Sequence, residues 1–108
     1  MNSLITPADL AQRLASPGAP RLLDVREPEE NAFAALPNST LIPLRELAAR
    51  IDELEEWRHQ EIVVYCHHGM RSLNGISILR QAGFQKLLNL QGGIDRWSLE
   101  VDPSLPRY

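Results

Sequence analysis

The sequence is poor in cysteine, in long apolar runs and in clustered positive charge. Cys66 is the only cysteine among 108 residues, which excludes an intramolecular disulfide and favours a reducing compartment. No apolar run approaches the ~20 residues that a membrane-spanning helix needs. The net charge is −3 and the eleven lysines and arginines form no basic run, which argues against general nucleic-acid binding. We therefore expect a cytoplasmic protein with no membrane and no nucleic-acid partner.

Targeting signals and repeats are also missing. The first six residues have neither a basic region nor an extended apolar region, so no signal peptide is expected. No internal repeat or low-complexity tract is visible. With 44% apolar and 23% charged residues, a chain of this length is expected to fold as one domain with its own core. We predict that the domain spans residues 1–101 and that residues 102–108 form an extended tail on its surface.

Short apolar runs alternate with helical patterns along the chain. Strands are predicted at residues 21–25, 40–42, 62–65 and 86–90, and the pattern also fits a short strand at residues 3–5. Helices are predicted to begin at Pro7 (with Thr6 as N-cap), Pro28, Pro43 and Arg71, and after Gly92-Gly93. This alternation favours an α/β fold with a mainly parallel sheet and helices on both faces. In such sheets ligands bind outside the carboxyl ends of the strands.

Two of the predicted helices have a clear apolar face. The helix after Pro43 is expected to bury Leu44, Leu47, Ala48, Ile51 and Leu54. The helix over residues 71–82 is expected to bury Leu73, Ile76, Leu79 and Ala82.

The most informative stretch is residues 61–80, EIVVYCHHGMRSLNGISILR. Its run from Ile62 to Tyr65 is typical of a strand buried on both faces, and a helix follows from Arg71. Between them lies Cys66-His67-His68-Gly69-Met70-Arg71, called the Cys66 loop below (residues 66–71). The first N–H groups of a helix lack partners inside the helix and, with the helix dipole, favour an anion. We therefore expect the Cys66 thiol to ionise readily and act as a nucleophile, although a buried cysteine is also commonly inert.

The charged and flexible residues of the loop each have two interpretations. A cation at a helix start opposes the dipole, so Arg71 either holds an anionic donor or forms an ion pair with Asp24 or Glu27. His67 and His68 either favour the thiolate or face the solvent. Gly69 is expected at a left-handed or crowded position, and Met70 at the mouth of a pocket rather than in the core.

No metal site and no cofactor are predicted. His67 and His68, with Cys66 and His59, invite a metal interpretation, but adjacent residues rarely turn toward one ion. The pair Gly92-Gly93 lacks the lysine of a nucleotide-binding phosphate loop.

In the Cys66 loop and in three further blocks, the chain resembles the rhodanese homology domain of the single-domain sulfurtransferase type. The resemblance is carried by four blocks: Cys66-x-x-Gly69-x-Arg71, Leu22-Leu23-Asp24-Val25-Arg26-Glu27, Leu36-Pro37, and Leu90-x-Gly92-Gly93-x-x-x-Trp97. The resemblance as a whole covers the chain from about residue 4 to its end. One stretch departs from the pattern. Many relatives carry Gly-His-Ile-Pro-Gly-Ala-x-Asn-x-Pro where residues 34–43 read AALPNSTLIP, without the glycines and the histidine.

The resemblance implies a rhodanese-like three-layer fold and a specific chemistry. Cys66 would take a sulfane sulfur from a donor such as thiosulfate, hold it as a persulfide and pass it to a thiol or cyanide. The residues implied to bind the substrate are His67, His68, Gly69, Met70 and Arg71. Asp24 and Arg26 are implied to support the pocket, the glycine pair to form a tight turn, and Trp97 to anchor the core.

Two alternatives accompany this interpretation. Residues 97–108, WSLEVDPSLPRY, resemble the end of rhodanese domains fused to adenylating enzymes. Such domains hand sulfur to a ubiquitin-like carrier, so the chain is alternatively a module that delivers sulfur to, or binds, a carrier protein. Cysteine-based phosphatases use Cys-x5-Arg, whereas this loop is Cys66-x4-Arg71, one residue shorter. The shorter loop favours sulfur transfer over phosphate hydrolysis.

Overall fold

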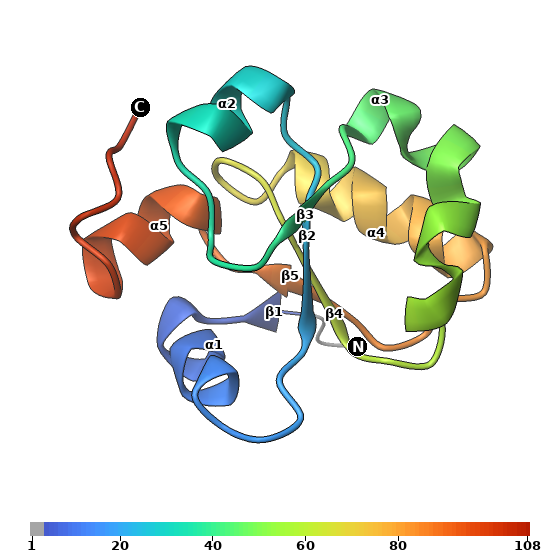
Figure 1. Ribbon diagram of the computed structural model, residues 1–108, viewed down its shortest axis with the longest axis horizontal. Coiled ribbons are helices and arrows are strands. Elements are labelled where there is room, and N and C mark those ends of the chain that lie inside the picture. The colour runs from blue at the N-terminus through green and yellow to red at the C-terminus, as the bar shows by residue number, and fades with distance from the viewer. Residues whose placement is uncertain (1–3) are drawn as a thin grey trace.

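A computed structural model describes residues 4–108 and contains a five-stranded, fully parallel sheet (Figure 1). The strands are β1 (Leu4–Ile5), β2 (Arg21–Asp24), β3 (Thr40–Leu41), β4 (Ile62–Tyr65) and β5 (Leu87–Leu90). The helices are α1 (Pro7–Leu14), α2 (Pro28–Phe33), α3 (Leu44–Leu47), the 3₁₀ helix η1 (Ala48–Trp57), α4 (Arg71–Gln81) and α5 (Gly93–Glu100). Each predicted strand is present within one or two residues of its expected bounds. Ser3, the first residue of the short N-terminal strand that we predicted, lies outside the described residues.

Helices cover both faces of the sheet, as Figure 1 shows. On one face, Leu10 of α1 and Ile94 and Trp97 of α5 pack in one apolar core. On the other face, a second core contains Leu47 and Leu54 from the α3–η1 segment and Ile76 and Leu79 from α4. The predicted three-layer α/β fold is therefore confirmed. Within residues 4–108, no helix combines the length and the apolar character needed to cross a bilayer.

The strand order, β1-β5-β4-β2-β3, places β4 in the middle of the sheet. All four residues of β4 are buried, as expected for a strand with helices on both faces. In the register of the sheet, Tyr65 lies beside Asp24 of β2, and Val64 lies beside Asn89 of β5. Cys66 follows Tyr65 directly, so its position at the centre of the sheet's carboxyl edge is set by the fold.

The prediction of one long, regular amphipathic helix after Pro43 is wrong. The α-helix ends at Leu47 and continues as η1, in which Arg50 (φ −113°, ψ 17°) leaves helical geometry. Leu47 and Leu54 are buried as predicted, whereas Ala48 is exposed. A 3₁₀ helix has three residues per turn, so the apolar face drifts away from the one that an α-helix would present.

Helix α4 starts at Arg71 as predicted, but its inner face differs at one position. Leu73 is 50% exposed, and Ser72 and Gly75 are buried instead. A Cβ atom on Gly75 would lie 3.3 Å from a methyl group of Val25 and 3.4 Å from one of Val64. The helix therefore approaches β4 so closely that small residues face the strand there. A larger side chain at position 75 would press against Val25 and Val64.

The stretch that departs from the rhodanese pattern keeps an ordered turn. Asn38 adopts the left-handed conformation (φ 61°), which asparagine tolerates better than most residues. The Tyr65 hydroxyl accepts a hydrogen bond from the Leu36 N–H (3.2 Å) and shares another with the Ser39 hydroxyl (2.9 Å). Asparagine and a buried tyrosine thus fix the turn without the glycines.

The C-terminal tail returns across the domain. In Figure 1 it runs from α5 to a point beside α2. Arg107 forms an ion pair with Asp95 (2.9 Å), and the rings of Tyr108 and Phe33 meet edge to face at 5.8 Å between centroids. The division into a domain (residues 1–101) and a tail (residues 102–108) remains a prediction.

Candidate active site

Cys66 lies at the base of its loop and is only 1% exposed. Its sulfur accepts hydrogen bonds from the backbone N–H groups of Gly69 (3.1 Å) and Ser72 (3.4 Å). Gly69 has a φ of 101°, so the predicted left-handed glycine is confirmed. The loop turns sharply at Gly69, so the Gly69 N–H points back at the Cys66 sulfur.

Two buried polar side chains that the sequence interpretation missed complete the surroundings of the sulfur. The Cys66 thiol lies 3.4 Å from the Ser72 hydroxyl, which donates to Asn89 Oδ1 at 2.5 Å. Asn89 Nδ2 in turn donates to the Gly69 carbonyl at 3.1 Å. A closed ring of contacts therefore runs through Cys66, Ser72, Asn89 and Gly69. The available signal was Asn89 itself, since a polar residue inside the apolar strand LLNL needs a buried partner.

The start of α5 holds the loop from the other side. The Ile94 N–H donates to the Cys66 carbonyl (2.9 Å), and the Asp95 N–H donates to the His67 carbonyl (3.1 Å). This approach needs glycine at position 93, because a Cβ atom there would lie 2.3 Å from the His67 carbonyl oxygen. The predicted tight turn at Gly92-Gly93 is confirmed, with both φ values positive. Its second glycine lets α5 brace the loop.

His67 is sandwiched between two rings. Its imidazole stacks on Tyr108 at 3.9 Å, nearly parallel, and lies 3.9 Å from the ring of His68. Its Nε2 atom is buried and has no hydrogen-bond partner among residues 4–108. Burial, assisted by His68, lowers the pKa of His67. His68 is mostly exposed, with its Nδ1 atom 3.9 Å from Asp95.

Arg71 pairs with neither of the two acids that the sequence suggested. Its two terminal nitrogens lie 2.6 Å and 2.8 Å from the two carboxylate oxygens of Glu30 in α2. These hydrogen bonds lower the pKa of Glu30 to about 2 and raise that of Arg71. Asp24 and Glu27 have other cationic partners, Arg26 and Arg45.

Asp24 and Arg26 form a fully buried ion pair behind the loop. Two nitrogens of the Arg26 guanidinium donate to the two Asp24 oxygens at 2.9 Å and 2.8 Å. The same guanidinium donates to the Ala34 carbonyl (2.6 Å) and to the Tyr108 hydroxyl (2.9 Å). The pair therefore joins the end of β2 to the segment after α2 and to the tail.

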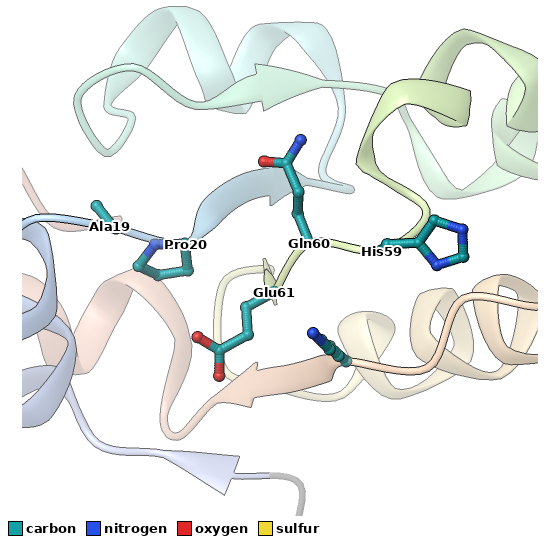
Figure 2. A pocket seen from close by; sticks show the side chains of 7 residues that line it. Ala19, Pro20, His59, Gln60 and Glu61 are labelled. Atoms are coloured by element: carbon teal, nitrogen blue, oxygen red, sulfur yellow. The ribbon is translucent and has the colours of Figure 1, made fainter.

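The remaining candidates lie at the surface. Met70 is part of the Cys66 loop and 72% exposed, in agreement with our expectation that it does not pack in the core. His59 precedes β4 and lines a hollow of about 460 Å³ at the opposite end of the strand from Cys66. Figure 2 shows His59, Gln60 and Glu61 with side chains that diverge. Gln60 and Glu61 are bound by Arg21 and Arg13. His59 therefore does not join the loop histidines.

The fold and this loop agree with a known family. The sequence profile of the rhodanese-like domain matches residues 6–100. The chain belongs to the rhodanese-like domain family.

Relatives of this rhodanese-like domain include short and long proteins. A sulfurtransferase of Allochromatium vinosum is 35% identical over 94 residues, which cover 87% of this chain and 86% of that protein. The adenylyltransferase and sulfurtransferase uba4 of Ogataea parapolymorpha is 34% identical, over 90% of this chain and 25% of that protein. The chain spans only 25% to 30% of two longer relatives. A rhodanese-related protein of Thermoplasma volcanium has a similar structure (TM-score 0.78, 35% identity, 95% and 94% of the two chains).

The geometry of this rhodanese-like domain suits a sulfur nucleophile. Backbone N–H groups point at the Cys66 sulfur, and the N-terminus of the eleven-residue helix α4 lies beside it. Such donors stabilise negative charge on sulfur. The hydrogen bonds through Ser72 and Asn89 fix the loop that carries these N–H groups.

Proposed function

We propose that this rhodanese-like domain transfers a sulfane sulfur through a persulfide on Cys66. In the first step the Cys66 thiolate attacks the outer sulfur of thiosulfate, a Cys66–sulfur bond forms, and sulfite leaves with the electron pair of the broken bond. In the second step cyanide or a thiol attacks the terminal sulfur of the persulfide and releases the thiolate. Cys66 is the only cysteine among these 108 residues, so the acceptor must come from outside this domain.

One observation carries the proposal. The Cys66 sulfur receives the Gly69 and Ser72 N–H groups at 3.1 Å and 3.4 Å in a loop held by α5 and Asn89. These donors would hold the terminal anion of a persulfide as well as the thiolate. We propose that Gly69 acts through its backbone and that His67, His68, Met70 and Arg71 line the approach of the donor. Asp24 and Arg26 are proposed to support the site from behind.

The alternative is delivery of sulfur to a carrier protein. It is supported by the tail, residues 97–108, and by the similarity to an adenylyltransferase and sulfurtransferase over 97 residues. The same Cys66 persulfide would serve this function, with a ubiquitin-like carrier as the acceptor. The single cysteine and the ordinary surface charge support the cytoplasm as the compartment.

Mass spectrometry after incubation with thiosulfate tests the proposal. We expect the protein to gain the mass of one sulfur atom on Cys66, and cyanide to remove it as thiocyanate. The Cys66→Ser variant should fold but gain no sulfur and form no thiocyanate. Turnover at the wild-type level in that variant would contradict the assignment. Loading without transfer to small acceptors would instead favour the carrier-protein alternative.

A further inference from the structure

Arg71, the cation at the start of the helix that follows Cys66, already has an anionic partner. Arg71 presents the two ends of its guanidinium to the two oxygens of Glu30, at 2.6 Å and 2.8 Å. This bidentate geometry is the one by which arginine recognises carboxylates and other planar or tetrahedral anions. An anionic sulfur donor that approaches Cys66 must therefore compete with Glu30 for Arg71.

Glu30 is held in this position from two further sides. The Tyr108 hydroxyl donates to Glu30 Oε2 at 2.7 Å, and the backbone N–H of Glu27 donates to Oε1 at 2.9 Å. Only 19% of the Glu30 side chain is exposed. Its carboxylate remains ionised at neutral pH, because hydrogen bonds from Arg71 lower its pKa to about 2. Displacement of Arg71 would thus leave a fixed negative charge at the entrance to the loop.

The other cations around the loop are also neutralised by carboxylates. Among residues 4–108, Arg26 forms an ion pair with Asp24 at 2.8 Å, and Arg107 forms one with Asp95 at 2.9 Å. Both pairs lie near His67, because Arg26 donates to the hydroxyl of Tyr108, whose ring stacks on the imidazole, and the Asp95 N–H donates to the His67 carbonyl. His67 does not add a permanent charge to the loop, since burial lowers its pKa. A dianion such as thiosulfate therefore meets paired cations and the ionised Glu30. Repulsion between like charges at a protein surface acts over several ångströms.

We propose that Glu30 determines donor specificity: by holding Arg71 it selects against dianionic donors and favours persulfides without net negative charge. The inference rests on the proposed function of Cys66. With such a persulfide the thiolate attacks the outer sulfur, the bond between the two donor sulfurs breaks, and the donor leaves as its thiolate with the electron pair of that bond. With thiosulfate the leaving group is sulfite, which takes the electron pair.

The test compares the loading rate of Cys66 with two donors. Thiosulfate carries two negative charges, whereas in cysteamine persulfide the ammonium group offsets the charge of the persulfide sulfur. Glu30→Gln should raise the second-order rate constant for thiosulfate by about tenfold, because Arg71 is then free to make one charge-assisted hydrogen bond to the donor. The same variant should not raise the rate with cysteamine persulfide. Adding Arg71→Ala to Glu30→Gln should remove the increase.

Two matched variants separate charge at Glu30 from charge on α2 in general. Glu29→Gln changes the net charge equally but alters an exposed carboxylate for which the structure shows no contact with Arg71, so its thiosulfate rate should change by less than about twofold. Glu30→Asp retains the charge and should keep the donor preference of the wild type. If Glu30→Gln failed to fold, the salt dependence of the wild-type thiosulfate rate would still test the proposal. Salt should increase this rate because it screens the repulsion between Glu30 and the dianionic donor.

Each result has a definite meaning. Equal effects of Glu30→Gln on both donors, equal effects of Glu29→Gln and Glu30→Gln, or a thiosulfate rate that falls with salt would overturn the specificity proposal. A wild type that forms no persulfide on Cys66 with either donor would instead overturn the proposed function itself.

Discussion

The Ser72 hydroxyl donates a hydrogen bond of 2.5 Å to the side-chain oxygen of Asn89. Through this bond a side chain of β5 fixes the first turn of α4, and the amide nitrogen of the same asparagine fixes the Gly69 carbonyl. Both backbone donors to the Cys66 sulfur therefore depend on Asn89, although Asn89 does not contact the sulfur in the structure.

Asn89→Leu should weaken both the fold and the site. The change leaves the buried Ser72 hydroxyl and Gly69 carbonyl without their partner, which costs about 1–3 kcal/mol in the free energy of unfolding. If Asn89 positions the donors, persulfide loading of the folded protein should also slow by roughly tenfold or more. Urea unfolding and single-turnover loading measure the two effects. A lower stability with unchanged loading would reduce Asn89 to a structural role.

Gly93→Ala should be far more harmful than Gly18→Ala, although both glycines have positive φ values (63° and 74°). Alanine in the left-handed region costs about 1–2 kcal/mol at either position. At Gly93 the new Cβ atom would also meet the His67 carbonyl at 2.3 Å, whereas at Gly18 no atom from a non-adjacent residue of the described chain lies within 4 Å.

Thermal denaturation checks this difference. Each kcal/mol should lower the melting temperature by roughly 4–8 °C in a domain of this size. Gly18→Ala should keep wild-type sulfur loading, while Gly93→Ala should lose it because α5 can no longer hold the loop. Similar melting temperatures for the two variants would show that the loop moves aside at little cost.

The sheet and the position of Cys66 were predictable because they depend on local patterns. The run from Ile62 to Tyr65 is apolar without alternation, and strands of this kind occupy the centre of parallel sheets. A cysteine at the end of such a strand lies at the carboxyl edge whichever helices cover the faces. The breakdown of the helix after Pro43 was not predictable from its apolar spacing, since 3₁₀ and α-helices share the i, i+3 pattern.

The partners of the site residues depended on distant contacts. Arg71 pairs with Glu30, 41 residues away, and the direction of α2 decides which of its neighbouring acids reaches the guanidinium. Tyr108 reaches His67 only because the tail returns across the domain. Neither contact leaves a periodic signal in the sequence.

The ion pair of Glu30 and Arg71 should make stability depend on pH in acid. The folded-state pKa of Glu30 is about 2, below the ordinary 4.5 of the unfolded chain. The stabilisation is therefore complete above about pH 4.5 and is lost as the pH falls toward 2. We expect Glu30→Gln to cost about 2 kcal/mol near pH 7, a value that allows for the partial exposure of Arg71.

The difference between wild type and Glu30→Gln should then shrink between about pH 4.5 and pH 2. Urea unfolding at pH 7, 4 and 2.5, chosen to lie roughly above, inside and near the end of this window, measures it. Other paired acids, such as Asp95, are present in both proteins and cancel in the comparison. A difference that stayed constant with pH would mean that Glu30 stabilises the fold by packing and not by its charge.

The last prediction concerns the Tyr108 ring and the protonation of His67. The two rings stack at 3.9 Å with an angle of 8° between their planes, and burial is the largest cause that lowers the His67 pKa. Tyr108→Ala should uncover the imidazole, so its pKa should rise toward the ordinary 6.5. Tyr108→Phe keeps the ring and should keep the low value, although it loses the hydroxyl contacts with Arg26 and Glu30.

An NMR titration of the His67 ring protons distinguishes these variants. The Tyr108 backbone, which raises the His67 pKa, is present in both variants and does not bias the comparison. Equal upward shifts in Tyr108→Ala and Tyr108→Phe would assign control of His67 to the hydroxyl network. No shift in Tyr108→Ala would mean that the loop itself buries the imidazole. A shift in Tyr108→Ala alone would establish that the tail keeps the residue next to Cys66 neutral. Since a neutral His67 adds no positive charge to the loop, the tail would then also contribute to the slow loading of Cys66 by dianionic donors.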